Sequence, residues 1–288
     1  MAKTETERHE LYNGSIVIDF YPKSHRYKLI SEDGVKVGAW LKSPSSIVDK
    51  LDKSGQLMSW AVNCFEERMI EEMRDGVQFT RDDVTSMLAV SKNAHTEKKK
   101  ASANVGTVVH YYAQHHAKIS SIEDAEGFED LDEPDQEKAR NGADAFDKWY
   151  EELGCEFVQS EFLIYSKKQR FVGRVDELIK TKNGLELIDY KTSKGVYTTQ
   201  VYQVTSYLKA KEEEEGIRIA GARLVHLIKD DIYDKDGNLI KKAGSFDEVY
   251  LSRKDLVDAY VVFKALKTVA ERDPIIKKII DKQKHERK

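Results

Sequence analysis

Two acidic side chains and one amine are spaced so that they can act together. We expect the run Leu187–Lys191 to be a β-strand. Residues two apart on a strand point to the same face, so Asp189 and Lys191 project together. A further carboxylate, Asp176, precedes Asp189 by an interval that fits two paired strands and a tight turn. The spacing therefore predicts that Asp176 lies beside Asp189.

Two neighbouring carboxylates require a compensating charge. At about 5 Å they repel by roughly 3 kcal/mol at an effective dielectric near 20. Either one of them is protonated or a cation lies between them, and oxygen ligands favour a hard divalent ion such as Mg²⁺ or Mn²⁺. Lys191 alone could also neutralise one of the pair. A half-buried ion network without catalysis is therefore the alternative.

Composition excludes several classes of protein. The chain has 288 residues, of which 40% are hydrophobic and 34% charged. It contains no run of the roughly 20 apolar residues that a membrane-spanning helix needs, so we expect an intracellular protein with no membrane partner. Two cysteines are too few for a disulfide scaffold, a four-cysteine zinc site or an iron–sulfur cluster. A formal net charge of −4 means that nucleic acid would need a local basic groove.

The order of expected elements predicts an α/β fold. Before residue 155 we expect a β-hairpin over 15–41, helices over 55–74, 82–119 and 134–153, and a solvated acidic loop over 123–135. After it we expect strands over 156–165, 171–180 and 185–192, a helix over 198–215, a strand over 222–228, a hairpin near Gly237 and a C-terminal helix from Arg253. Asn183-Gly184 predicts a tight turn between two of these strands. We expect residues 1–90 to form a hairpin and helical lobe packed on a core of residues 91–288.

Four short motifs carry a resemblance to a known family. They are Gly106-Thr107-Val108-Val109-His110, Gly173-Arg174-Val175-Asp176, Asp189-Tyr190-Lys191-Thr192-Ser193 and Gln203-Val204-Thr205-Ser206-Tyr207. In this order, over about residues 100–228, they resemble the PD-(D/E)XK nuclease superfamily, and within it the RecB-like and phage-exonuclease branch. The resemblance implies an αβββαβ core, in which helices flank a central mixed sheet.

The same resemblance implies a role for each motif residue. One or two Mg²⁺ or Mn²⁺ ions would be bound by His110, Asp176, Asp189 and the carbonyl of Tyr190. The catalytic group would comprise Asp176, Asp189, Lys191, Gln203 and Tyr207. Nucleic acid would be contacted by Lys98, Lys99, Lys100, Thr107 and Arg174. Glu161 matches a further acidic position of the family only in general character.

Several of these residues also have a simpler interpretation. Taken alone, His110 is more often a satisfied interior histidine than a ligand, although Gly106 clears the same helix face one turn earlier. Gln203 and Tyr207 could simply pack over the hydrophobic core, since they lie four residues apart on one helix face. The run 98–100 could be a solvated face.

The expected activity is hydrolysis of DNA phosphodiester bonds by metal-activated water, from ends or single strands. An endonuclease of the same fold and an inactive nucleic-acid-binding module are the alternatives. A homo-oligomer, or a recombination or replication partner protein, remains open. The resemblance also implies a chain that could be phage-encoded and act in a bacterial host.

Overall fold

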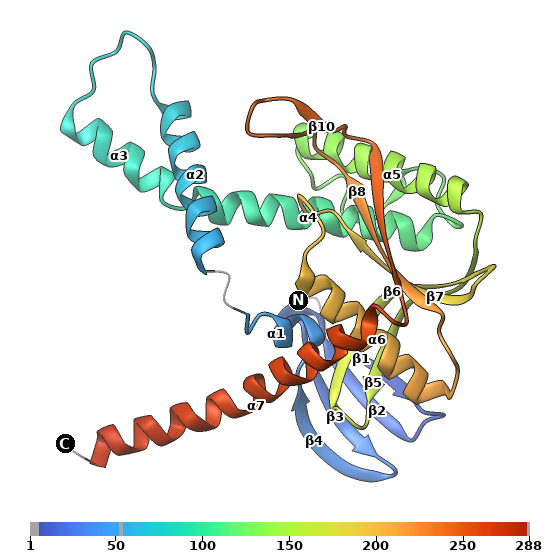
Figure 1. The fold of residues 1–288 in the computed structure, drawn as a ribbon. Coiled ribbons are helices and arrows are strands. Elements are labelled where there is room, and N and C mark those ends of the chain that lie inside the picture. Colours follow the sequence, from blue (N-terminus) through green and yellow to red (C-terminus); the bar gives the residue numbers. More distant parts are fainter. Residues whose placement is uncertain (1–5, 52–53, 287–288) are drawn as a thin grey trace. The chain divides into compact units, whose positions relative to one another are not determined.

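The computed structural model describes residues 6–51 and 54–286, and the chain forms two compact units (Figure 1). The first unit comprises Met1–Leu51 and Asp144–Lys288, and the second comprises Asp52–Ala143. The domain boundary expected near residue 90 falls inside helix α3 (Arg81–Ser91). No described helix is long and apolar enough to cross a lipid bilayer.

A five-stranded mixed sheet forms the centre of the first unit, with the strand order β11-β8-β7-β6-β5. Its strands are β5 (Glu156–Ser166), β6 (Phe171–Thr181), β7 (Gly184–Lys191), β8 (Gly221–Ile228) and β11 (Ser245–Ser252). β7 and β8 are parallel and are connected through α6 (Thr198–Glu215), whereas the other neighbours are antiparallel. The expected strands and helix are confirmed, and β11 is an additional strand. Beside it, β9 (Ile232–Tyr233) and β10 (Leu239–Lys241) form the expected hairpin.

Helices cover both faces of the central sheet. On one face, α1 (Pro44–Val48), α6 and α7 (Leu256–Glu286) share a buried core with the strands. On the other face, Tyr190 packs edge-on against Phe146 and Trp149 of α5 (Glu133–Leu153), with ring centroids 5.6 and 5.7 Å apart. Because both faces are covered, five consecutive residues of β7, Glu186–Tyr190, are buried.

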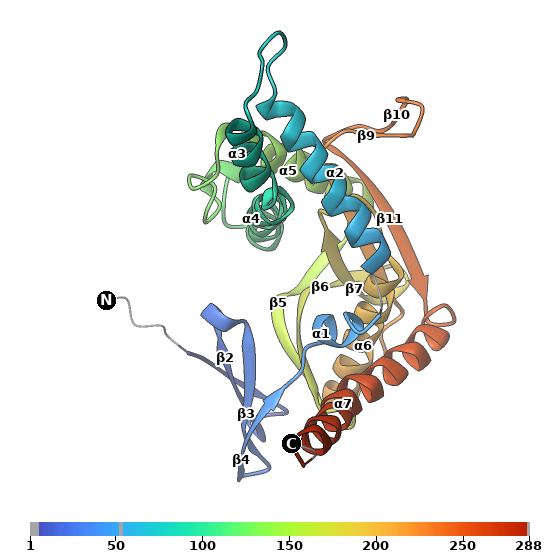
Figure 2. The ribbon, with the colours of Figure 1, turned by 90° about the vertical axis from the view of Figure 1, so that its left-hand side faces the viewer.

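The N-terminal segment forms a four-stranded antiparallel sheet, so the prediction of a single hairpin was wrong in strand number. The strands are β1 (Glu7–Leu11), β2 (Ile16–Tyr21), β3 (Arg26–Glu32) and β4 (Val35–Leu41), with a short 3₁₀ turn, η1 (Pro22–Ser24), after β2. β1 escaped prediction because its sequence ERHEL is mostly exposed and shows no apolar alternation. Ile16, Ile18 and Phe20 pack against Leu163 and Val172 of the central sheet. In Figure 2 the N-terminal strands lie next to β5 of the central sheet.

The second unit is helical. The predicted helix over 82–119 is divided into α3 and α4 (Ala94–His115), and α2 (Ser54–Glu72) precedes both. The acidic segment 123–135 is largely a loop with mostly exposed acidic side chains, as expected, but apolar side chains anchor it. It begins in a 3₁₀ turn, η2 (Ile122–Asp124), and apolar side chains recur at every third position and are buried: Ile122, Ala125, Phe128 and Leu131. The high acidic content concealed this apolar period.

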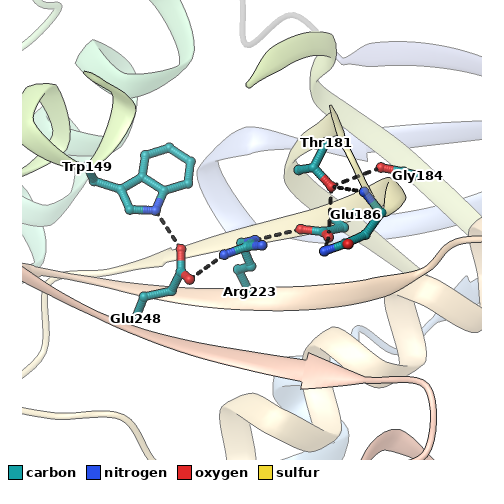
Figure 3. Close-up of polar contacts among 7 residues, drawn as sticks. Trp149, Thr181, Gly184, Glu186, Arg223 and Glu248 are labelled. Atoms are coloured by element: carbon teal, nitrogen blue, oxygen red, sulfur yellow. Dashed lines mark hydrogen bonds and ion pairs between the residues drawn. The ribbon is translucent and has the colours of Figure 1, made fainter. Parts of the chain in front are cut away.

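A buried charge network joins α5 to the central sheet (Figure 3). Arg223 of β8 donates from Nε to Glu186 of β7 at 2.5 Å, and its Nη1 donates to Glu248 of β11. The indole of Trp149 donates to the other oxygen of Glu248 at 2.8 Å, and Thr181 donates to the other oxygen of Glu186 at 2.9 Å. All four carboxylate oxygens therefore accept a hydrogen bond, which offsets the cost of burying them.

Candidate active site

Asp176 is positioned where the pairing of β6 with β7 ends. The last regular pair is Glu177 opposite Ile188, so Asp176 and Asp189 come next on the two strands. Oδ2 of Asp176 accepts a hydrogen bond of 2.8 Å from the backbone N–H of Tyr190. A carboxylate of β6 thus takes the place of a backbone acceptor, and this bond fixes Asp176 beside β7. The prediction that Asp176 lies beside Asp189 agrees with this bond, since Tyr190 directly follows Asp189.

Asp189 and Lys191 form an ion pair on the same face of β7. Nζ of Lys191 lies 2.5 Å from Oδ2 of Asp189. The Asp189 side chain is only 5% exposed and that of Lys191 16%, so water screens the pair weakly. Tyr190 points to the opposite face, against α5. The predicted division of faces along this strand is confirmed.

Gln203 and Tyr207 lie one turn apart on α6 and are hydrogen-bonded, Gln203 Nε2 donating to the Tyr207 hydroxyl at 2.7 Å. Burial raises the pKa of Tyr207 well above its usual value, and the negative charges of Asp189 and Asp176 contribute in the same direction. The phenol therefore stays protonated. Because its oxygen accepts from Gln203, its own hydrogen can be donated elsewhere.

Gly173 makes room for Tyr207, which explains a glycine in the middle of β6. A Cβ built on Gly173 would lie 2.4 Å from Cε1 of Tyr207, closer than any real contact. The glycine backbone conformation is ordinary, so its role is close approach and not a special dihedral angle. The sequence indicated that Gly173 belongs to a motif, but the packing partner came only from the structure.

Glu177 was missed by the sequence interpretation. It is completely buried on β6 and accepts a hydrogen bond of 2.7 Å from Ser160. Burial raises the pKa of Glu177 to about 8 against the opposing effect of Ser160, and the charge of Asp176 adds to the increase. The available signal was an acid directly after Asp176, inside the apolar run from Phe171 to Ile179.

His226 is a second residue that the sequence interpretation missed. It lies on β8 opposite Lys191, is 1% exposed, and its Nε2 contacts the carbonyl oxygen of Ser193. Burial lowers its pKa, so the ring favours the neutral form. Ser193 also accepts a hydrogen bond of 3.3 Å from Gln200 of α6. The chain that follows Lys191 is therefore tied to both β8 and α6. A lone histidine within an apolar strand was the signal.

The other predicted residues lie on β6 and on α4. Arg174 of β6 is engaged in ion pairs with Glu161 at 2.6 Å and Glu7 at 3.0 Å. His110 is half-buried on α4 of the second unit. The same helix carries exposed residues predicted to contact nucleic acid: Lys98, Lys99, Lys100 and Thr107. Lys98 pairs with Glu67 at 2.6 Å, and Thr107 donates to the Ala103 carbonyl at 3.0 Å. The roles of these residues stay predictions.

The donors beside β7 suit a hard divalent cation. Two carboxylates and a backbone carbonyl supply only oxygen, and Mg²⁺ is commonly held by one or two carboxylates together with waters and substrate phosphate. Among the residues that the structure describes, no group of three or more acidic, histidine or cysteine side chains is gathered as a metal site. The side-chain donors of Asp176 and Asp189 fit the smaller Mg²⁺ set.

Comparisons with known proteins give a limited result. No protein-family model matches the chain, and no curated protein matches it. An alkaline exonuclease (LHK-Exo) from Laribacter hongkongensis is similar in structure with a TM-score of 0.32 and 12% identity, over 84% of this chain and 93% of that one. LHK-Exo in complex with dAMP gives a TM-score of 0.28 and 15% identity, over 65% of this chain and 98% of that one. Scores this low establish neither the fold nor an activity.

Proposed function

We propose that this chain is a metal-dependent deoxyribonuclease of the PD-(D/E)XK type that hydrolyses DNA phosphodiester bonds from ends or single strands. The observation that carries the proposal is the arrangement of Asp176, Asp189 and Lys191 where the pairing of β6 with β7 ends. Asp176 is fixed by the Tyr190 N–H, and Asp189 is paired with Lys191 at 2.5 Å. The motif resemblance that starts from the same residues supports this proposal.

Mg²⁺ or Mn²⁺ would be held by Asp176, Asp189 and the Tyr190 carbonyl, and would lower the pKa of a bound water and offset charge on the phosphate. Lys191 is the group that can act directly on the reacting phosphate. Its ammonium can bind a phosphate oxygen whose charge rises during attack, or transfer a proton to or from water. Its pairing with Asp189 keeps the amine at the strand end before substrate binds.

Tyr207 and Gln203 supply orientation on the face that carries Asp189. Gln203 fixes the phenol through a hydrogen bond of 2.7 Å, and burial keeps the phenol protonated. A fixed neutral donor can position a phosphate oxygen or a water without adding charge. Gly173 maintains this geometry because it allows the Tyr207 ring to lie against β6.

A DNA digestion assay tests the proposed function. The purified chain is incubated with closed circular, linear double-stranded and single-stranded DNA in Mg²⁺, with EDTA as the metal-free control. We expect loss of only the free-ended forms, dependence on Mg²⁺, and no cleavage by Lys191→Ala. Lys180→Ala, an exposed lysine on the neighbouring strand, is the matched control and should cleave as wild type does.

The three possible results separate the candidate functions. Loss of the closed circle would indicate an endonuclease of the same fold. Persistence of every DNA form, with binding retained, would indicate a nucleic-acid-binding module and would contradict the proposed chemistry. Full activity of Lys191→Ala would remove the role that we give to this amine.

A further inference from the structure

The outward face of the N-terminal sheet combines aromatic and basic side chains. Alternate residues of β2 and β3 point inward to the core, which leaves the intervening residues on the other face. On this face Tyr21 lies opposite Arg26, and Lys28 lies opposite Trp40. We call these four residues, Tyr21, Arg26, Lys28 and Trp40, the basic-aromatic face.

Trp40 is the centre of the basic-aromatic face. It lies on β4, the edge strand of the sheet, and is 49% exposed. The guanidinium carbon of Arg26 is 4.0 Å from the centroid of the Trp40 ring, and Nζ of Lys28 is 5.6 Å away. The Tyr21 ring lies 5.3 Å from it at a tilt of 54°. Cations that lie next to an exposed indole can bind a ligand that carries both a negative charge and a planar ring.

A pocket of about 200 Å³ continues this surface past the edge of β4. Its wall includes Trp40 and three basic side chains: Lys42, Arg170 and Lys267. Arg170 is paired with Glu32 at 2.9 Å, and Lys267 with Glu271 at 2.5 Å. The bridge between Lys42 and Phe171 fixes the pocket between the N-terminal and central sheets of the same unit.

The positive charge of this surface is only partly compensated. Within the described part of the chain, no ion pair joins Arg26, Lys28 or Lys42 to an acid. Asp19, which lies opposite Lys28, pairs with Arg8 at 2.8 Å, and Glu32 and Glu271 pair with Arg170 and Lys267. Three cations without an acidic partner, gathered around one exposed indole, do not stabilise the hydrophobic core. They match a ligand that has regularly spaced negative charges and planar rings, which is the chemistry of single-stranded nucleic acid.

We propose that the basic-aromatic face and the adjoining pocket bind single-stranded DNA outside the catalytic cluster. A base stacks on Trp40, and the flanking phosphates contact Arg26, Lys28 and Lys42. This inference rests on the proposed function for its choice of DNA as the ligand. It assigns the N-terminal sheet a role in holding the strand that the nuclease cleaves.

Binding is measured with a fluorescein-labelled oligothymidine and the full chain in EDTA, so that cleavage does not interfere. Trp40→Ala should weaken binding by about 10-fold, since stacking on one aromatic side chain contributes an effect of this order. Trp40→Phe keeps an aromatic ring and should retain most of the affinity. Arg26→Ala combined with Lys28→Ala should weaken binding and reduce its salt dependence.

Tyr233→Ala is the matched control, because Tyr233 is an aromatic residue 55% exposed on β9 and outside this surface. It should bind as wild type does. Thermal unfolding of each variant verifies that it is folded. If folded Trp40→Ala binds like wild type, or if wild type binds no oligothymidine, the inference is overturned.

The outcomes also separate this inference from the proposed function. Cleavage by the wild type with no effect of Trp40→Ala on binding would remove the inference and leave the nuclease assignment intact. Trp40-dependent binding by a chain that cleaves no DNA would remove the nuclease assignment and leave the binding surface intact.

Discussion

Two acid–base clusters in the central sheet differ in the cation that they use. In the first cluster Arg223 forms ion pairs with both Glu186 and Glu248. The uncharged side chains of Thr181 and Trp149 donate hydrogen bonds to the other oxygens of these carboxylates (Figure 3). At the end of β7, Lys191 pairs with Asp189, and Asp176 accepts a hydrogen bond from the backbone N–H of Tyr190. Both clusters contain two acids and one base on neighbouring elements.

The difference separates a structural ion network from a cluster that can do chemistry. A guanidinium is planar, stays protonated and fixes two carboxylates at once. A lysine amine is a point charge on a flexible chain, and it can exchange a proton or move to a phosphate. Glu177 shows a third solution, because burial raises its pKa to about 8 despite the opposing hydrogen bond from Ser160, and the carboxyl holds a proton. The type of partner therefore indicates the role of each buried acid.

The largest expected effect is the loss of DNA cleavage in the Lys191→Arg variant. The variant keeps the positive charge beside Asp189 but removes an amine that can give up a proton and replaces it with a wider, rigid fork. We expect the cleavage rate to fall by about 10²–10⁴-fold, measured under single-turnover conditions with linear DNA in Mg²⁺. Lys180→Arg is the matched control. A variant that cleaves at half the wild-type rate would show that only the charge of Lys191 matters.

A large effect on stability is expected for Arg223→Leu. The change leaves Glu186, which is completely buried, without its cation, so the free energy of unfolding should fall by about 2–4 kcal/mol. Urea denaturation measures this loss, and cleavage by the folded variant should remain. Arg140→Leu removes an exposed pair with Glu123 and should change stability much less than Arg223→Leu does. Equal effects of the two substitutions would contradict the structural role of Arg223.

The smallest expected effect concerns the pH dependence of stability through Glu177. Because its pKa is raised to about 8, the folded state holds this proton more tightly than the unfolded state does. Stability should therefore fall as pH rises from about 4.5 to about 8. Glu177→Gln is neutral throughout and should remove this slope, and near pH 9 it should be more stable than wild type by roughly 1–3 kcal/mol.

Thermal unfolding across this pH range measures the Glu177 effect. Glu156→Gln changes an exposed carboxyl on the adjacent strand and should keep the wild-type slope. If wild type and Glu177→Gln show the same slope, Glu177 does not hold the proton that we assign to it.

Much of the candidate site could be predicted from the sequence because its contacts are local. Alternation along β7 places Asp189 and Lys191 on one face, and a tight turn at Gly184 brings β6 back beside β7. Helical spacing places Gln203 one turn from Tyr207. The N-terminal sheet was less predictable, since its first strand carries charges where an apolar alternation would be needed.

The sequence by itself determined which side chains share a face and which strands are joined by a short turn, because backbone geometry repeats every few residues. Only the tertiary structure decided which acids are buried, which cation each one meets and which glycine a ring covers. Arg223, Glu186 and Glu248 lie on three different strands, and Tyr207 of α6 packs against Gly173 of β6. Desolvation and packing depend on the elements that cover a residue. The spacing of residues along the chain does not reveal which elements these are.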